Sequence, residues 1–127
     1  MQEKDLFEYA VVRVVPRVER EEFINVGLVL YCGKRKFLDV LFELDAEKLS
    51  VFCKETDISV LRENLQAFER ICAGGELSGT IGKLDIASRF RWLTAIRSTV
   101  IQTSRAHAGF CTDPKKTMEK LFAEFVL

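Results

Sequence analysis

The chain lacks the features that would direct it to a membrane. No apolar run approaches the roughly 18 residues that a membrane-spanning helix needs. The first nine residues, MQEKDLFEY, mix acidic and basic side chains and lack the apolar region of a signal peptide. We therefore expect a cytoplasmic protein that does not enter a membrane.

The chain also has no excess of charge of either sign. Lys and Arg number 19, Asp and Glu number 19, and the formal net charge is +0. A balanced chain has no overall field to attract nucleic acid or an anionic bilayer. Nucleic acid is therefore a disfavoured partner, although a local basic patch would not show in this sum.

Residues that bind metals or act as nucleophiles are few and widely spaced. The cysteines are Cys32, Cys53, Cys72 and Cys111, without a C-x-x-C pair, and His107 is the single histidine. Zinc sites need closer ligands, so we expect no metal and no cofactor, and we expect the cysteines to be small apolar core residues. No complete catalytic constellation is evident, which favours a protein that is not an enzyme and leaves catalytic residues unassigned.

Alternating apolar residues predict strands, and a change to helical periodicity after Asp45 predicts helices. The expected strands cover 7–15, 23–32, 36–44 and 98–103. The expected helices cover 46–54, 58–72, 89–95 with Ser88 as cap, and a C-terminal segment that begins at Asp113-Pro114. The clearest is 58–72, because Asp57 suits its N-cap and Gly74 its end.

The order of these elements predicts an α+β fold. We expect a single domain, 1–127, with a mostly antiparallel sheet of about four strands and two main helices packed on one face. The glycine-rich stretch 74–83 matches no phosphate-binding motif, so we expect a loop there and assign it no role.

The stretch EEFINVG at 21–27 brings polar side chains into the start of an apolar strand. Strict alternation puts Phe23, Asn25 and Gly27 on one face and Glu22 on the other, whereas a strand that starts at Asn25 would let both polar residues point to one neighbour. Arg13 is the isolated charge of the first strand. Because an unpaired buried guanidinium is costly, we predict an ion pair. Its candidate partners are Glu22, Asp39 and Glu43.

The stretch RFRWLTAIRSTVIQTS at 89–104 is rich in hydrogen-bond donors. Arginines with hydroxyls suit a phosphate or carboxylate, because the guanidinium group binds oxygens in pairs. Arginines between aromatic residues also suit stacking on single-stranded nucleic acid. The structural alternative is a strand with a polar outer face, whose arginines bind helix carbonyls or acids.

We predict that these two stretches face each other and share one pocket. The candidate anion-binding or partner-binding residues are Arg13, Glu22, Asn25, Arg91, Trp92, Arg97, Ser98 and Thr99.

Four motifs in order, YAVVRVVP, EEFINVGLVL, RFRWLTAIRSTVIQTS and DPKKTMEKLFAEFVL, resemble a bacterial family, domain of unknown function 3037 (DUF3037). The resemblance runs from Tyr9 to Leu127, and Ile96 departs from the proline expected there in many relatives. It implies no established activity. Genes of such families often lie near genes for serine/threonine kinases resembling the HipA toxin, which implies an accessory role beside a kinase.

Three functions are compatible with these sequence features, in order of preference. The first is a non-catalytic protein-binding or regulatory accessory module, with a HipA-like kinase as the implied partner. The second is a small enzyme or binding domain for a phosphorylated or other anionic small molecule, with Arg91 and Arg97 holding the anion and Glu22 as acid or base. The third is binding of single-stranded nucleic acid through residues 89–92.

Overall fold

The computed structural model describes residues 4–15, 22–52, 57–75, 79–95 and 100–127. In chain order its elements are β1 (Asp5–Val14), β2 (Ile24–Cys32), β3 (Phe37–Phe42), α1 (Ala46–Phe52), α2 (Ile58–Ala73), α3 (Gly79–Gly82), α4 (Ile86–Leu93), β4 (Ile101–Thr103), β5 (His107–Cys111) and α5 (Pro114–Phe125). These elements confirm the α+β fold class, with an open antiparallel sheet over the described ranges.

β1 lies inside the sheet and holds two different partners along one of its edges. The strand order is β3-β2-β1-β4, and β5 also pairs with β1. Residues 12–14 of β1 pair with β4, and residues 5–9 pair with β5. Between these two partners, the Ser104 N–H donates to the Val11 carbonyl at 2.8 Å, and the Ser104 Oγ accepts from the Val11 N–H at 2.9 Å. β4 and β5 therefore form one interrupted edge strand, of which the β5 part was not predicted.

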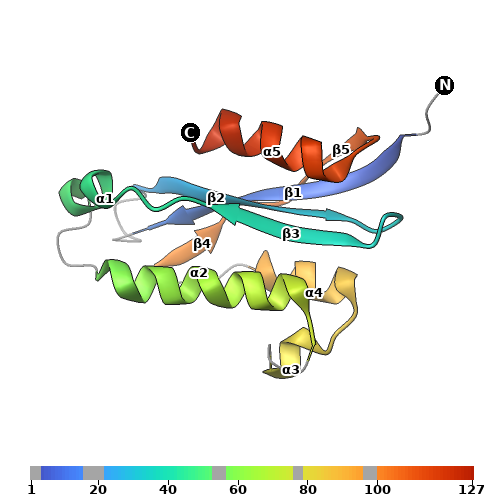
Figure 1. Cartoon of the computed structure of the whole chain (residues 1–127), viewed down its shortest axis with the longest axis horizontal. Coiled ribbons are helices and arrows are strands. Elements are labelled where there is room, and N and C mark those ends of the chain that lie inside the picture. The colour runs from blue at the N-terminus through green and yellow to red at the C-terminus, as the bar shows by residue number, and fades with distance from the viewer. Residues whose placement is uncertain (1–3, 16–21, 53–56, 76–78, 96–99) are drawn as a thin grey trace.

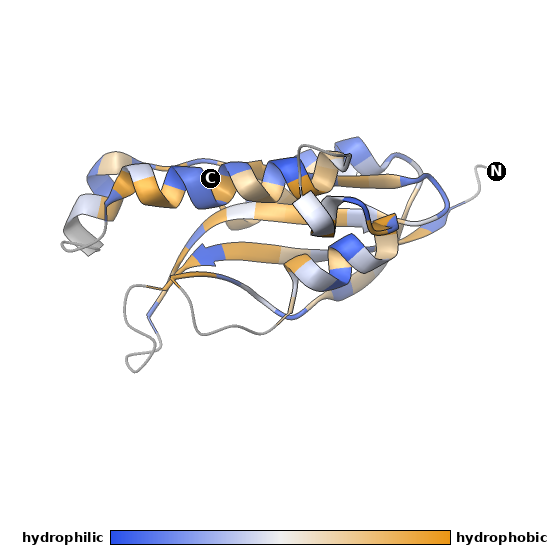
Figure 2. Ribbon diagram, turned by 90° about the horizontal axis from the view of Figure 1, so that it is seen from below, coloured by the Kyte–Doolittle hydropathy of each residue, from blue (hydrophilic) through white to orange (hydrophobic). Residues whose placement is uncertain are grey.

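Helices cover both faces of the sheet, with α2 and α4 on one face and α5 on the other (Figure 1). The predicted packing of both main helices on a single face is therefore not confirmed. The reason lies in β1 and β2, which carry apolar side chains on both faces, so that each face requires a cover. Hydropathy colouring shows the apolar strand residues beneath α2 and α4 (Figure 2).

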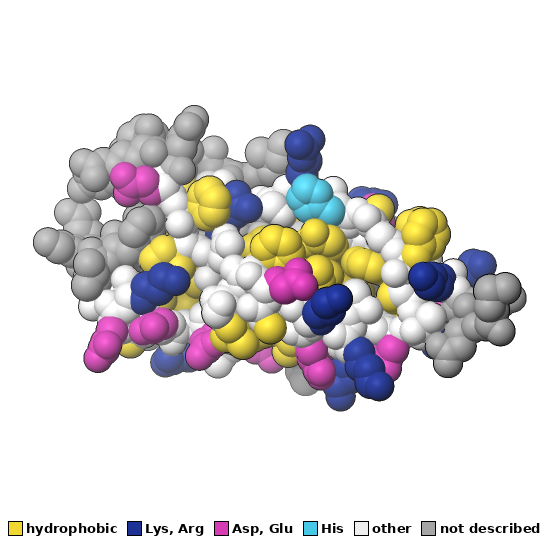
Figure 3. Space-filling view, turned by 90° about the horizontal axis from the view of Figure 1, so that it is seen from above, with side chains coloured by type: hydrophobic (Ala, Val, Ile, Leu, Met, Phe, Trp, Pro, Cys, Tyr) yellow, Lys and Arg dark blue, Asp and Glu magenta, His cyan; other side chains and the backbone are white. Residues whose placement is uncertain are grey.

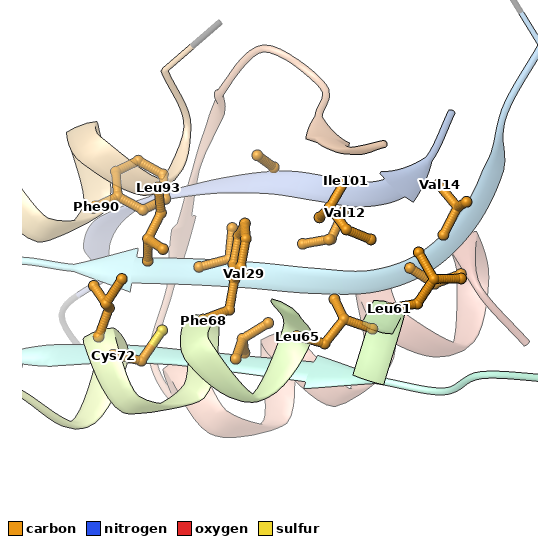
Figure 4. Close-up of a cluster of buried hydrophobic side chains, with 14 of the residues drawn as sticks. Val12, Val14, Val29, Leu61, Leu65, Phe68, Cys72, Phe90, Leu93 and Ile101 are labelled. Carbon is orange, nitrogen blue, oxygen red and sulfur yellow. The ribbon is translucent and has the colours of Figure 1, made fainter. Parts of the chain in front are cut away.

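The larger apolar cluster fills the space between the sheet and α2 with α4 (Figure 4). Val12 and Val29 come from the sheet, Leu65 from α2, and Phe90 from α4, and none of these side chains is more than 1% exposed. The smaller cluster lies under α5 and contains Phe7, Val11, Leu28, Leu30, Cys32, Cys111 and Met118. Burying both clusters is the main stabilising contribution to this fold.

The prediction for α2 is confirmed to within one residue. The Asp57 carboxylate accepts hydrogen bonds from the Ser59 hydroxyl at 2.7 Å and from the Ser59 N–H at 2.9 Å, and these bonds hold the pKa of Asp57 below its ordinary value. Gly74 ends the helix with a φ of 76°, a conformation that favours glycine. α4 differs from its prediction, because its cap is Asp85, whose carboxylate accepts from the Ser88 N–H.

The cysteines that the structure describes are core residues. Cys32, Cys72 and Cys111 are buried with free thiols, as predicted, and Cys53 lies outside the described residues. Burial raises the pKa of Cys72 to about 12, which keeps this thiol protonated and unreactive at neutral pH.

Across the described ranges, no helix has both the length and the apolar character that crossing a membrane requires.

Candidate functional site

An irregularity in the pairing of β1 with β2 decides where the polar residues of EEFINVG point. Val12 lies opposite Gly27, but the next residue, Arg13, lies opposite Asn25, so β2 has one extra residue between them. Such a β-bulge breaks the alternation of side chains along the strand. As a result Asn25 faces α5 together with Arg13, whereas Gly27 faces α2. The alternation predicted from sequence put Asn25 and Gly27 on the same face, and the bulge overturns it.

Asn25 joins the start of β2 to the end of α5. Its Nδ2 donates to the carbonyl of Phe125 at 3.1 Å, a group that lies at a helix end and has no partner within the helix. Its Oδ1 is buried and accepts no hydrogen bond from the residues that the structure describes. Beside it lies a cavity of about 220 Å³ whose polar lining includes Glu43, Asp45 and Lys48.

Arg13 has an aromatic neighbour where a carboxylate was expected. Its guanidinium carbon lies 3.9 Å from the centre of the Phe23 ring, and Phe23 is 46% exposed. The Arg13 Nε is buried without a hydrogen-bond partner among the described residues, and burial lowers the pKa of Arg13. No ion pair to Arg13 exists within those residues, so the predicted pair with Glu22, Asp39 or Glu43 is not found. A cation–π contact takes its place.

A second aromatic group continues along the same face of β1. The Tyr9 ring centre lies 5.4 Å from the centre of His107 and 6.0 Å from that of Phe125. We call the set Tyr9, Arg13, Phe23, His107 and Phe125 the arginine–aromatic surface. In Figure 3 the single histidine lies beside a group of hydrophobic side chains on this face. The three rings of this group were not predicted from sequence because they come from β1, β5 and α5, which only the fold brings together.

Arg91 and Trp92 lie on the opposite face of the sheet. Arg91 Nη1 and Nη2 donate to the two carboxylate oxygens of Glu8 at 3.1 and 2.9 Å, and this pair joins α4 to β1. The sheet thus separates Arg91 from Arg13 and Asn25, so the shared pocket predicted from sequence is not formed by the described residues. Three further candidates, Arg97, Ser98 and Thr99, lie outside those residues, and Glu22 is exposed just before β2.

The neighbours of Arg91 have structural roles. Arg89 Nη1 donates to the carbonyls of Ile71 and Cys72, both at 2.8 Å, at the C-terminal end of α2. Phe90 is fully buried, and its ring centre lies 5.3 Å from that of Tyr31. A buried ring cannot stack on a nucleotide base, and Arg89 is held by helix carbonyls. This part of the stretch therefore matches the structural alternative.

Trp92 lines a mostly apolar cavity of about 500 Å³ between α2, α4 and β4. Phe68 and Ile71 of α2 form one wall, and Val100 and Ile101 form another. Asn64 contributes an amide to this lining.

The arrangement is suited to binding. Within the part of the chain that the structure describes, no three His, Cys, Asp or Glu side chains come together as a metal site would require. The arginine–aromatic surface instead offers a guanidinium group and several ring faces, which are complementary to a carboxylate and to apolar side chains.

Comparison with known proteins identifies the family. No curated protein and no solved structure matched the chain. Residues 9–126, nearly the whole chain, match the family described as protein of unknown function DUF3037. The chain therefore belongs to the DUF3037 family.

Proposed function

We propose that this chain is a non-catalytic protein-binding module and that it holds its partner through the arginine–aromatic surface. The observation that carries this proposal is the environment of Arg13: a partly buried guanidinium that lies against the half-exposed ring of Phe23. No described carboxylate pairs with it. A carboxylate from a partner would supply the missing counter-charge.

The chemistry of the surface favours a protein over a small anion. Arginine and aromatic residues are enriched among the residues that dominate protein–protein binding energies. The rings of Tyr9, His107 and Phe125 extend the surface well beyond what a single phosphate would contact. Anion binding through Arg91 would first have to break its two hydrogen bonds with Glu8.

The partner we infer presents an acidic side chain next to an apolar one. A HipA-like kinase, which the family resemblance implies, is the first partner to test, with the bacterial cytoplasm as the inferred location. The module would act by occupying or positioning its partner, because its binding surface offers no catalytic constellation.

Site-specific photo-crosslinking in cells tests this proposal. A benzoylphenylalanine replaces Phe23 on the arginine–aromatic surface, and in a matched control it replaces Val60, which is 48% exposed on α2. We expect a protein adduct of discrete mass from position 23 and none from position 60. Adding Arg13→Gln should remove the adduct while the thermal unfolding temperature stays within a few degrees of the parent.

Two outcomes would contradict the proposal. One is the absence of any adduct at position 23. The other is an adduct that Arg13→Gln leaves at full yield, because the guanidinium would then have no part in binding.

A further inference from the structure

β5 leaves one side of the sheet open. It pairs with β1 only, among the strands that the structure describes. Natural sheets usually protect such an edge with charged residues, proline or a covering segment, because its free N–H and C=O groups can pair with another strand. The β5 sequence HAGFC contains no Asp, Glu, Lys or Arg and no proline.

An exposed apolar pair lies at this edge. Phe110 of β5 and Leu6 of β1 are opposite each other in the register, and they are 68% and 53% exposed. They lie on the face away from Phe7 and α5, so neither takes part in the arginine–aromatic surface. From the edge and this pair we infer that β5 pairs antiparallel with β5 of a second copy of the chain, which joins two sheets into one.

Around Gly109, the β5 sequence has a small residue on one side and a large one on the other, so that two antiparallel copies would place large residues opposite small ones. A two-fold axis at Gly109 places Phe110 of one copy opposite Ala108 of the other, and opposite residues of an antiparallel pair share a face. Each large ring would then lie over a small side chain and beside its own Leu6. Gly109 itself brings no side chain to the axis, where the Phe7 ring already fills the space that a Cβ would need (2.8 Å to Cζ).

The charges that flank β5 agree with an axis at Gly109. Arg105 and Asp113 lie four residues before and four residues after Gly109, and both are exposed. The axis therefore brings the arginine of each copy towards the aspartate of the other, twice in the dimer.

Sedimentation equilibrium with the full chain tests the inference over a range of concentrations. We expect a species of twice the 14.5 kDa chain mass that dissociates on dilution. Phe110→Lys should give the monomer mass throughout, because two lysines would meet the edge. The matched control Val60→Lys also replaces an exposed apolar residue, but on α2, and it should keep the dimer.

Arg105→Glu tests the register. Replacing attraction by repulsion in both symmetric pairs should weaken the dimer by about tenfold or more at low salt. Thermal melts of each variant show that it is folded, as expected for exposed positions. A wild-type chain that stays monomeric at every concentration would overturn the inference, and so would a dimer that Phe110→Lys leaves intact. A dimer that Arg105→Glu leaves unchanged would overturn the axis at Gly109.

Discussion

Arg89 should stabilise the fold more than Arg91, although the two are close together in one basic stretch. Arg89 Nη1 donates to the carbonyls of Ile71 and Cys72 at 2.8 Å each, in a partly buried position at the end of α2. A positive charge is favourable at this end of a helix. Arg91 forms its ion pair with Glu8 at the surface, where its side chain is 59% exposed.

The magnitudes follow from these environments. Hydrogen bonds that involve a charged group contribute roughly 1.5–3 kcal/mol when one partner is removed. The two bonds of Arg89 come from one nitrogen and are not independent, so Arg89→Met should lower the free energy of unfolding by about 2–3 kcal/mol. An exposed ion pair contributes about 0–1 kcal/mol, so Arg91→Met should have a much smaller effect. Methionine keeps an apolar stem at both positions, which limits the comparison to the guanidinium group.

Urea unfolding followed by far-UV circular dichroism measures both variants. With a denaturant slope of roughly 1–3 kcal/mol/M for a chain of this size, Arg89→Met should lower the urea midpoint by about 0.7–3 M. The slope should stay unchanged, because the surface exposed on unfolding is the same. If Arg89→Met and Arg91→Met have equal midpoints, the role assigned to Arg89 at the end of α2 is wrong.

Two further predictions concern packing and a thiol. Gly27→Ala should destabilise the fold by about 1–3 kcal/mol, because its Cβ would lie 2.7 Å from the backbone oxygen of Leu41. Gly33→Ala is the matched control, because its Cβ would meet the side chain of Tyr31 at 2.7 Å instead of backbone, and a side chain can shift more easily; it should therefore destabilise the fold less than Gly27→Ala does. Equal urea midpoints for the two variants would refute the argument. Cys72, with a pKa of about 12, should resist alkylation by iodoacetamide in the folded protein and react with it in concentrated urea. Mass spectrometry measures both alkylation rates. If Cys72 is alkylated as fast in the native state as in urea, the thiol is not buried.

Local sequence determined the elements whose causes lie within a few residues. α2 was predicted to within one residue because Asp57, its apolar stripe and Gly74 are all local signals. The two faces of β1 also followed from alternation, since Phe7, Tyr9 and Val11 lie on one face and Ala10 and Val12 on the other. The Asp113-Pro114 start of α5 was predicted for the same reason.

β5 and the position of α5 could not be predicted in this way. The segment 107–111 has little apolar alternation and becomes a strand because β1 is long enough to offer it a second row of hydrogen-bonding groups. α5 covers the face that α2 and α4 leave open, a choice that depends on the apolar content of both faces of the sheet. Both outcomes depend on partners far away in the chain.

The candidate site shows most clearly which features the sequence determined and which the tertiary structure decided. Sequence alone identified Arg13 and Asn25 as unusual polar residues, and it identified the family of the chain. Only the tertiary structure decided that a one-residue bulge turns Asn25 towards Arg13, that Phe23 is the neighbour of this arginine, and that the sheet separates both polar residues from Arg91. The physical reason is that residue type fixes which groups need partners, whereas strand register and the packing of distant elements fix which partners they find.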